Sequence, residues 1–359
     1  MRLSLCIIAR DEEAFIDECL ESARDHVDEI VVVDTGSTDR TVEIAHEHGA
    51  RVVHVAWKNN FAAARNASLE MATGTHALIL DADERLVDGE AARERIDAFV
   101  ARHPGWSGRV RIVNEPGGSQ SSITRLVPLD GLHQFRGRVH EQVVFALGEP
   151  LREDLGIVVR HLGYAEDVMV ERQKTERYRE LLELELSERP DDEYAWYQLG
   201  RTLHAGGSHE EARAAFERAL ELGGDECSFA PHLVESLAYC LRGLERSTEA
   251  LRLVEPWARR CADRSDTQFV AALLALDIGH LEHARRGFTE CLALAGGQPD
   301  GGPHDPASST VAPAHNLGVM AEVLGRTEDA RAWFGRALEF APNHGPSLAG
   351  LDRLRSRAA

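Results

Sequence analysis

The sequence predicts an α/β domain followed by an all-α domain built from helical repeats. In the first part of the 359-residue chain, short apolar runs alternate with amphipathic stretches, which is typical of a parallel sheet covered by helices on both faces. In the second part the pattern is helical throughout and repeats itself. We therefore expect the first domain at residues 1–165, a connecting helix at residues 166–192 and the repeats at residues 193–359.

Four strands, each followed by a helix, are expected at the start of the first domain. Their apolar runs occupy residues 3–9, 29–34, 51–57 and 76–84. The helix after the second run has Ser37 or Thr38 as its predicted N-cap and Gly49 at its end. From about Trp106 to Gly163 the pattern is rich in strands, and we expect these strands to add an antiparallel part to the sheet.

The helical half contains a repeat that is visible in two windows of 34 residues, 193–226 and 311–344. Five positions agree between them: Leu199, Gly200, Ala212, Phe216 and Ala219 correspond to Leu317, Gly318, Ala330, Phe334 and Ala337. Small residues at these positions let two antiparallel helices approach closely while Leu and Phe fill the space between them, as in tetratricopeptide repeats. We expect about four helix pairs with a flexible insertion near residues 296–310, and an unrelated helical bundle is the alternative.

The composition excludes several classes of protein. A formal net charge of -20 argues against sequence-independent binding of nucleic acid and against binding to an anionic membrane surface. No segment has the roughly 20 apolar residues of a membrane span, and the short N-terminal apolar run is unlike a secretory signal. The six cysteines are scattered, so we expect reduced thiols. Together these features predict a cytoplasmic protein.

Carboxylates stand at the ends of the predicted parallel strands. Asp34 lies in Asp-Thr-Gly-Ser, which carries the catalytic carboxylate of aspartic proteases, but those enzymes are all-β and need a second such carboxylate. Here the motif occurs once and a helix follows it. Asp81 and Asp83 end the fourth strand, about 7 Å apart along an extended chain. Ligands of open α/β sheets bind at this edge, and such carboxylates can hold Mg²⁺ or Mn²⁺ together with a diphosphate.

Five stretches carry a resemblance to a known family. In order they are SLCIIARDEEAFIDECLES, DEIVVVDTGSTDRTVEIA, FAAARNASLEMATG, ALILDADE and FRGRVHEQV. They resemble family 2 glycosyltransferases of the GT-A (Rossmann-like) fold, above all the bacterial subgroup that carries C-terminal tetratricopeptide repeats. The resemblance implies a nucleotide-sugar-binding domain, a nucleotide diphosphate donor such as a UDP-sugar, and Mg²⁺ or Mn²⁺ as the cofactor.

The resemblance also implies roles for single residues. Those at the nucleotide sugar would be Ala9, Arg10, Glu12, Asp34, Arg65 and Asp81. Asp83 would hold the metal, with Asp81 beside it at the diphosphate and sugar. For Arg65 a structural ion pair is the alternative to a place near the donor phosphates. The family usually has Asn-Glu after the first strand, whereas this chain has Asp11 and Glu12, and a carboxylate cannot donate as an amide does.

The stretch RVHEQ supplies the candidate catalytic groups. Transfer with inversion needs a base for the acceptor's proton, and Glu141 is our candidate, with His140 or Asp154 next. His140 is also the candidate third metal ligand or diphosphate contact. Neighbouring residues on a strand point to opposite faces, so both can act only if the chain bends here; otherwise one of them is structural. His161 is a second candidate near the site, with packing as its alternative role.

The predicted function is therefore a metal-dependent, inverting glycosyltransferase whose repeats present a protein or peptide acceptor. The alternatives are a saccharide or lipid-linked acceptor, with the repeats forming a homodimer, and a non-catalytic repeat scaffold. The scaffold is disfavoured because the candidate carboxylates and the histidine are all present. A nucleotidyltransferase would want a glycine-rich loop with a basic residue after the first strand, and ARDEEAF has neither glycine nor lysine.

Overall fold

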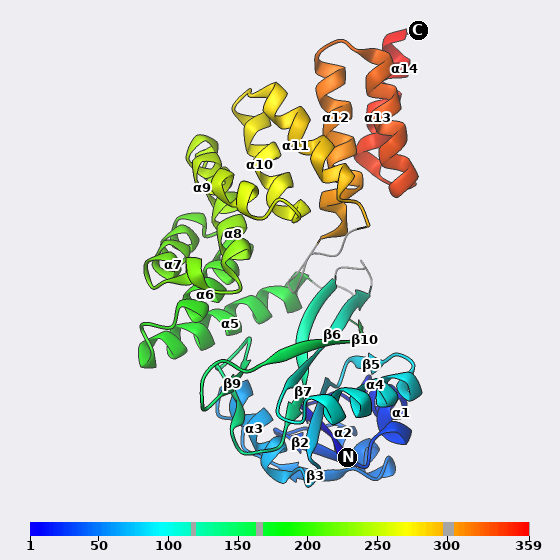
Figure 1. Cartoon of the computed structure of the whole chain (residues 1–359), viewed down its shortest axis with the longest axis vertical. Helices are drawn as coiled ribbons and strands as arrows, with labels where there is room; N and C mark the ends of the chain where they lie inside the picture. The colour runs from blue at the N-terminus through cyan, green and yellow to red at the C-terminus, as the bar shows by residue number, and fades with distance from the viewer. Residues whose placement is uncertain (116–119, 163–167, 297–304, 359) are drawn as a thin grey trace. The chain divides into compact units, whose positions relative to one another are not determined.

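The computed structural model describes residues 1–115, 120–162, 168–296 and 305–358. They form two compact units, Met1–Pro190 and Asp191–Ala359 (Figure 1). The first is α/β and the second is helical, which confirms the predicted fold class. Helix α5 (Val168–Glu188), predicted as part of a connector, belongs to the first unit, and the predicted boundary at residue 165 lies outside the described residues.

An eight-stranded mixed sheet forms the centre of the first unit, in the order β3-β2-β1-β4-β7-β6-β10-β5. Its strands are β1 (Leu3–Ala9), β2 (Glu29–Asp34), β3 (Arg51–His54), β4 (His76–Asp81), β5 (Glu84–Leu86), β6 (Ser107–Glu115), β7 (Gln120–Pro128) and β10 (Arg152–Leu162). The four strands β3, β2, β1 and β4 are parallel, as their apolar runs predict. Strand β7 is antiparallel to both of its neighbours, but β10 runs parallel to β6. The prediction of an antiparallel addition is therefore confirmed for β7 but was wrong for the pairing of β10 with β6, because the chain returns to the start of β6 before it forms β10.

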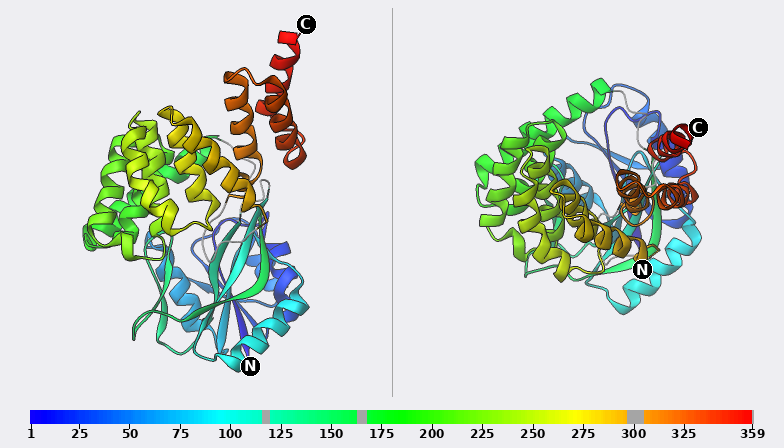
Figure 2. Two further views of the ribbon diagram at one scale, coloured as in Figure 1. Left: turned by 45° about the horizontal axis from the view of Figure 1, so that its top comes forward. Right: turned by 90° about the horizontal axis from the view of Figure 1, so that it is seen from above.

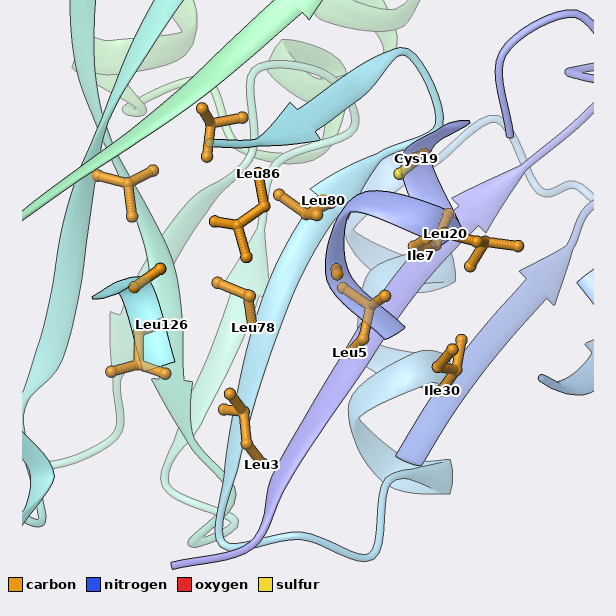
Figure 3. Close-up of a cluster of buried hydrophobic side chains, with 14 of the residues drawn as sticks. Leu3, Leu5, Ile7, Cys19, Leu20, Ile30, Leu78, Leu80, Leu86 and Leu126 are labelled. Carbon is orange, nitrogen blue, oxygen red and sulfur yellow. The ribbon is translucent and has the colours of Figure 1, made fainter. Parts of the chain in front are cut away.

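Helices and a small hairpin cover the two faces of this sheet. Leu5 and Ile7 point to the face where α1 (Ile16–Ala23), α2 (Thr41–Glu47) and α4 (Gly89–Arg102) pack (Figure 3). Cys6, between them in the sequence, points to the other face, because side chains alternate along a strand. That face is covered by α3 and by the hairpin of β8 and β9. Their bounds are Phe61–Met71, His133–Arg136 and Gln142–Phe145.

The sheet has to curl because of the connection between β4 and β5. Only Ala82 and Asp83 separate these strands in the sequence, yet three other strands lie between them in the sheet. Three Cα steps reach at most about 11 Å, whereas four strand spacings in a flat sheet would span about 19 Å. The strands β7, β6 and β10 therefore form a curved surface (Figure 2), which returns β10 toward the end of β4.

The described part of the second unit consists of four antiparallel helix pairs and a last helix (Figure 2). These are α6 (Glu193–Ala205), α7 (His209–Glu221), α8 (Ala230–Gly243), α9 (Ser247–Arg260), α10 (Ser265–Asp277), α11 (Leu281–Ala293), α12 (Val311–Val323), α13 (Thr327–Phe340) and α14 (Gly345–Ala358). Of the predicted insertion, residues 297–304 lie outside the described ones, and Pro306–Ser309 forms a 3₁₀ turn. No helix in the described ranges is both long and apolar enough to cross a membrane.

The repeated glycine and phenylalanine have a direct structural reason. A Cβ atom added at Gly200 would lie 2.5 Å from the ring of Phe216, and one added at Gly318 would lie 2.6 Å from the ring of Phe334. Both rings are fully buried. In the first and the last pair, the phenylalanine of the second helix therefore occupies the space that a side chain on the first helix would need.

Candidate active site

The carboxyl ends of three parallel strands bring two of the predicted aspartates to one edge of the sheet. In the strand register, Ala9 of β1 stands opposite Asp34 of β2, and Ile8 of β1 stands opposite Asp81 of β4. Because β1 lies between the other two strands, the backbones of Asp34 and Asp81 are about 10 Å apart. This is the edge at which α/β sheets bind their ligands.

Asp81 is held by two buried arginines. Arg65 of α3 donates to its Oδ1 at 2.6 Å, and Arg125 of β7 donates to its Oδ2 at 2.7 Å. Burial alone would raise the pKa of Asp81, but the two guanidinium groups outweigh burial and hold that pKa well below its usual range. Asp81 is therefore an oriented carboxylate with an arginine on each oxygen.

Arg125 and Glu84 were not among the predicted site residues. Glu84 contacts Arg125 and accepts a hydrogen bond from the backbone N–H of Asp81 at 3.0 Å. Burial raises the pKa of this glutamate to about 7. The signal in the sequence was an arginine inside the apolar run SITRLVP, because a buried arginine needs a carboxylate partner.

Glu141 joins the same cluster from an irregular loop. RVHEQVVF does not form one strand: β8 ends at Arg136, and β9 begins only at Gln142. Within the loop, His140 has a positive φ of 53°, so the chain bends where the two candidate groups stand. Glu141 contacts Arg65 through Oε1, while the His140 ring meets the ring of Tyr178 edge-on, 5.3 Å between centroids.

Arg65 thus forms the structural ion pair that was the alternative to a phosphate contact. It bridges Asp81 and Glu141, and these two charges raise its pKa against the effect of burial. Its Nη1 atom is buried and has no hydrogen-bond partner within the described ranges. The predicted contact with the donor phosphates stays a prediction.

Helix α5 supports the loop that carries Glu141. The backbone N–H of Arg138 donates to Glu185 at 2.8 Å, and its guanidinium group pairs with Glu188 at 2.6 Å. On the other side, the carbonyl of Arg138 accepts from the backbone N–H of Phe61 at the start of α3. The loop is therefore fixed between two helices, one of which was expected only to connect the domains.

Asp83, in the link between β4 and β5, contacts His161 of β10, the strand that pairs with β5. The Nε2 atom of His161 lies 3.0 Å from Oδ2 of Asp83, and its Nδ1 atom lies 2.8 Å from Asn114. The hydrogen bond to Asp83 raises the pKa of His161, against the effect of burial. Asp154, a reserve candidate for the base, stands opposite Arg109 of β6, whereas His161 stands opposite Asn114, about 17 Å further along that strand, which removes Asp154 from the site.

The donor atoms at this edge fit a sparsely coordinated divalent cation. Both oxygens of Asp81 bond to arginines, so the groups that would hold Mg²⁺ or Mn²⁺ are the Asp83 carboxylate and, next to it, the His161 imidazole. A cation with so few protein ligands takes the rest from water and a diphosphate, as is usual for Mg²⁺. The role of His140 as a third ligand stays a prediction.

Asp34 is enclosed by its own turn. Its carboxylate accepts hydrogen bonds from the backbone N–H groups of Gly36 and Ser37, at 3.2 and 3.0 Å, and lies 3.0 Å from His54. Burial would raise its pKa, but these hydrogen bonds outweigh burial and lower it. The Asp34 side chain is 4% exposed, whereas the His54 side chain is 68% exposed, so the histidine lies on the solvent side of the carboxylate.

Hydrogen bonds hold the loops after β1 and β2 together beside Asp34. Asp11, with φ of 54°, accepts hydrogen bonds from the backbone N–H and the hydroxyl of Thr38 and donates its own N–H to Ser37. The predicted N-caps were therefore wrong, and α2 begins later, at Thr41, whose hydroxyl accepts from the N–H of Glu12. Aspartate tolerates this backbone region as asparagine does, which explains why it can replace the usual asparagine.

Comparison with known proteins agrees with this architecture. Residues 4–119 match the model of glycosyl transferase family 2. The first unit contains a family 2 glycosyltransferase domain. Residues 193–225, which include α6 and α7, match the tetratricopeptide repeat, so the transferase domain is followed by such repeats.

Two known proteins are similar to this chain over most of its length. A TPR repeat-containing protein of Synechococcus elongatus is 35% identical over 68% of this chain and 62% of its own length. The SPbeta prophage-derived glycosyltransferase SunS of Bacillus subtilis is 28% identical over 76% of this chain and 66% of its own. The chain thus spans less than two thirds of each relative. The crystal structure of S. aureus TarS aligns over 70% of this chain and 54% of TarS, with a TM-score of 0.42 and 15% identity.

Proposed function

We propose that the protein is a metal-dependent, inverting glycosyltransferase that takes a sugar from a nucleotide diphosphate donor, a UDP-sugar. The observation that carries the proposal is the set of oriented carboxylates at the carboxyl ends of β2 and β4, inside a family 2 domain. The residues assigned to the nucleotide sugar are Ala9, Arg10, Glu12, Asp34, Arg65 and Asp81. Asp83 is assigned to the metal, with His161 beside it.

The reaction needs a base, and Glu141 takes that role in the proposal. The acceptor oxygen attacks the anomeric carbon as the bond from that carbon to the diphosphate breaks, and the acceptor's proton goes to the glutamate. Arg65 contacts Oε1 of Glu141, so we assign Oε2 to the proton. A bound Mg²⁺ or Mn²⁺ would neutralise charge on the departing nucleoside diphosphate.

For the acceptor we propose a protein or peptide held by the repeats. Stacked helix pairs present surfaces suited to extended peptides. The second unit has a cavity of about 760 Å³ whose lining includes Tyr239, Arg242 and Asp277, a mixture of aromatic and charged groups suited to a polypeptide. The alternative is a homodimer formed through the repeats, with a saccharide or lipid-linked acceptor.

Calorimetric titration with UDP-glucose and UDP-N-acetylglucosamine tests the donor and the metal together. We expect binding in Mn²⁺ to be lost or strongly weakened in a chelator, and Asp83→Asn to behave in Mn²⁺ as the wild type does in the chelator. Asp154→Asn is the matched control, since it changes a carboxylate about 17 Å from the site and should leave binding unchanged. Equal affinity with and without metal would remove the role assigned to Asp83.

A further inference from the structure

Three side chains of metal-binding type meet in the second unit, outside the transferase domain. His204 near the end of α6, His209 at the start of α7 and Cys240 in α8 each bring one ligand atom within 4.8 Å of the other two. The Nδ1 atoms of the two histidines lie 3.1 Å apart. Among the described residues, no other group of three or more His, Cys, Asp or Glu side chains meets this condition.

The helix turn and the packing of the next repeat create this arrangement. A tight turn with Gly207 at φ of 81° joins α6 to α7, so the two histidines face each other across it. Cys240 is fully buried on α8, and its thiol donates to the backbone carbonyl of His209 at 2.9 Å. A bound ion would therefore connect the first helix pair to the second.

The chemistry of the three groups suits a zinc-type ion. Zn²⁺ prefers imidazole nitrogen and thiolate sulfur in a tetrahedral arrangement, in which two nitrogen ligands stand about 3.3 Å apart. Burial, together with the neighbouring His209, lowers the pKa of His204, which keeps this imidazole in the neutral form that binds metal. Burial raises the pKa of the Cys240 thiol, so metal binding would release its proton.

We propose that His204, His209 and Cys240 form a binding site for Zn²⁺ or a similar thiophilic divalent cation. His204 also lines the cavity of about 760 Å³ in this unit, together with Arg201 and Tyr239. Three protein ligands leave one coordination position for a water or for a donor atom of a molecule in the cavity. The site is independent of the proposed sugar transfer, because none of its ligands belongs to the transferase domain.

Cobalt spectroscopy on the full-length chain tests the proposal. With excess Mg²⁺ present to occupy carboxylate sites, titration with Co²⁺ should produce a thiolate-to-cobalt absorption band that saturates at one equivalent and disappears when Zn²⁺ is added. Cys240→Ser should abolish the band. Cys291→Ser is the matched control, since Cys291 is also fully buried in a repeat helix and donates to a backbone carbonyl, that of Ser265.

The histidines give a second test that does not depend on the buried cysteine. His204→Gln and His209→Gln change partly exposed rings, and each should lower Zn²⁺ affinity by about 100-fold or more, since loss of a supporting group alone costs 10- to 100-fold. Absence of the cobalt band in the wild type, or its persistence in Cys240→Ser, would overturn the proposal. Unchanged Zn²⁺ affinity in both histidine variants would also overturn the proposal. The short distance between His204 and His209 would then reflect only a hydrogen bond between the two rings.

Discussion

At the scale of single residues, one guanidinium group organises two carboxylates to which we assign different roles. Arg65 contacts Asp81, assigned to the donor, and Glu141, assigned to the acceptor's proton. Arg65 is itself buried, with its guanidinium carbon 5.6 Å from the ring centroid of Phe135 on β8. Because Arg65 is held in this way, its two contacts fix the positions of the Asp81 and Glu141 carboxylates relative to each other. Each carboxylate can therefore be tested separately while the other remains in place.

Replacing Glu141 with glutamine should separate binding from turnover. Glutamine keeps the shape of the side chain but cannot accept a proton, so we expect turnover to fall by about 100-fold or more, the usual effect of losing a general base. Donor affinity measured by calorimetry should stay at the wild-type level. Asp154→Asn is the control, because it changes a carboxylate about 17 Å from the site and should leave turnover unchanged. Near-normal transfer by Glu141→Gln would mean that another group is the base.

Removing Arg125 should destabilise the fold through the charges that it leaves behind. Arg125→Met leaves Glu84 and Asp81 without this partner, and breaking a buried ion pair in this way costs about 3–5 kcal/mol. Adding Glu84→Gln should recover part of the loss, since one buried charge is then removed. Urea denaturation of the two variants measures both values, and equal stability of the single and double variants would contradict the coupling.

At the scale of elements, apolar runs predicted the strands but not which strands become neighbours. Runs such as LSLCIIA are local patterns, and the structure confirms the parallel strands predicted from them. His161 and Asp83 are 78 positions apart in the sequence, and their contact depends on the pairing of β10 with β5. No local pattern contains that pairing. The positive φ of His140 was equally hard to predict, because only a small fraction of histidines adopt this backbone conformation.

The start of β2 depends on Glu29, which receives hydrogen bonds from Ser4 on β1 and from Thr73 and Gly74 before β4. Glu29→Gln should lower the free energy of unfolding by about 2 kcal/mol near neutral pH, the cost of hydrogen bonds to a charged group. Burial would raise the pKa of Glu29, but the hydrogen bonds outweigh it and lower the pKa below 4.5. The stabilisation by the charged Glu29 is therefore fully present above pH 4.5, the ordinary pKa of this side chain, and is lost as the pH falls through the lower pKa of the folded state.

Denaturation at a series of pH values checks this expectation. The difference between wild type and Glu29→Gln should shrink as the pH is lowered below about 4.5. Donor binding of the variant at neutral pH should be normal, because Glu29 stands at the opposite end of β2 from Asp34. A stability difference that stays constant down to pH 3 would show that the charge of Glu29 is not responsible.

At the scale of the whole molecule, the two units divide the proposed work. All residues assigned to the donor and to the proton lie before residue 165, whereas the cavity and the candidate zinc site belong to the second unit. Helix α5 is the exception to a simple division at residue 165, since Glu185 and Glu188 support the loop before Glu141. The first unit therefore extends to Pro190.

Two truncated chains separate these contributions. A chain that ends at Pro190 should bind the donor in Mn²⁺ as the full chain does, but should lose transfer to the natural acceptor or lose dimerisation. A chain that ends at residue 165 should bind donor but turn it over more slowly, because the loop of Arg138 loses its contacts with α5. Circular dichroism must first show that both are folded. Full acceptor activity in the chain ending at Pro190 would remove the repeats from substrate selection.

The curl of the sheet has a consequence for how the protein is made. A ribosome releases the chain from its N-terminus, so β1 to β4 can assemble while β10 is still being synthesised. Asp83 emerges with them, but its partner His161 follows 78 residues later. A nascent chain therefore holds the aspartate pair without the histidine, and the two halves of the candidate metal site meet only when the last strand closes the curl. Capture of the cation would then mark the completion of the domain.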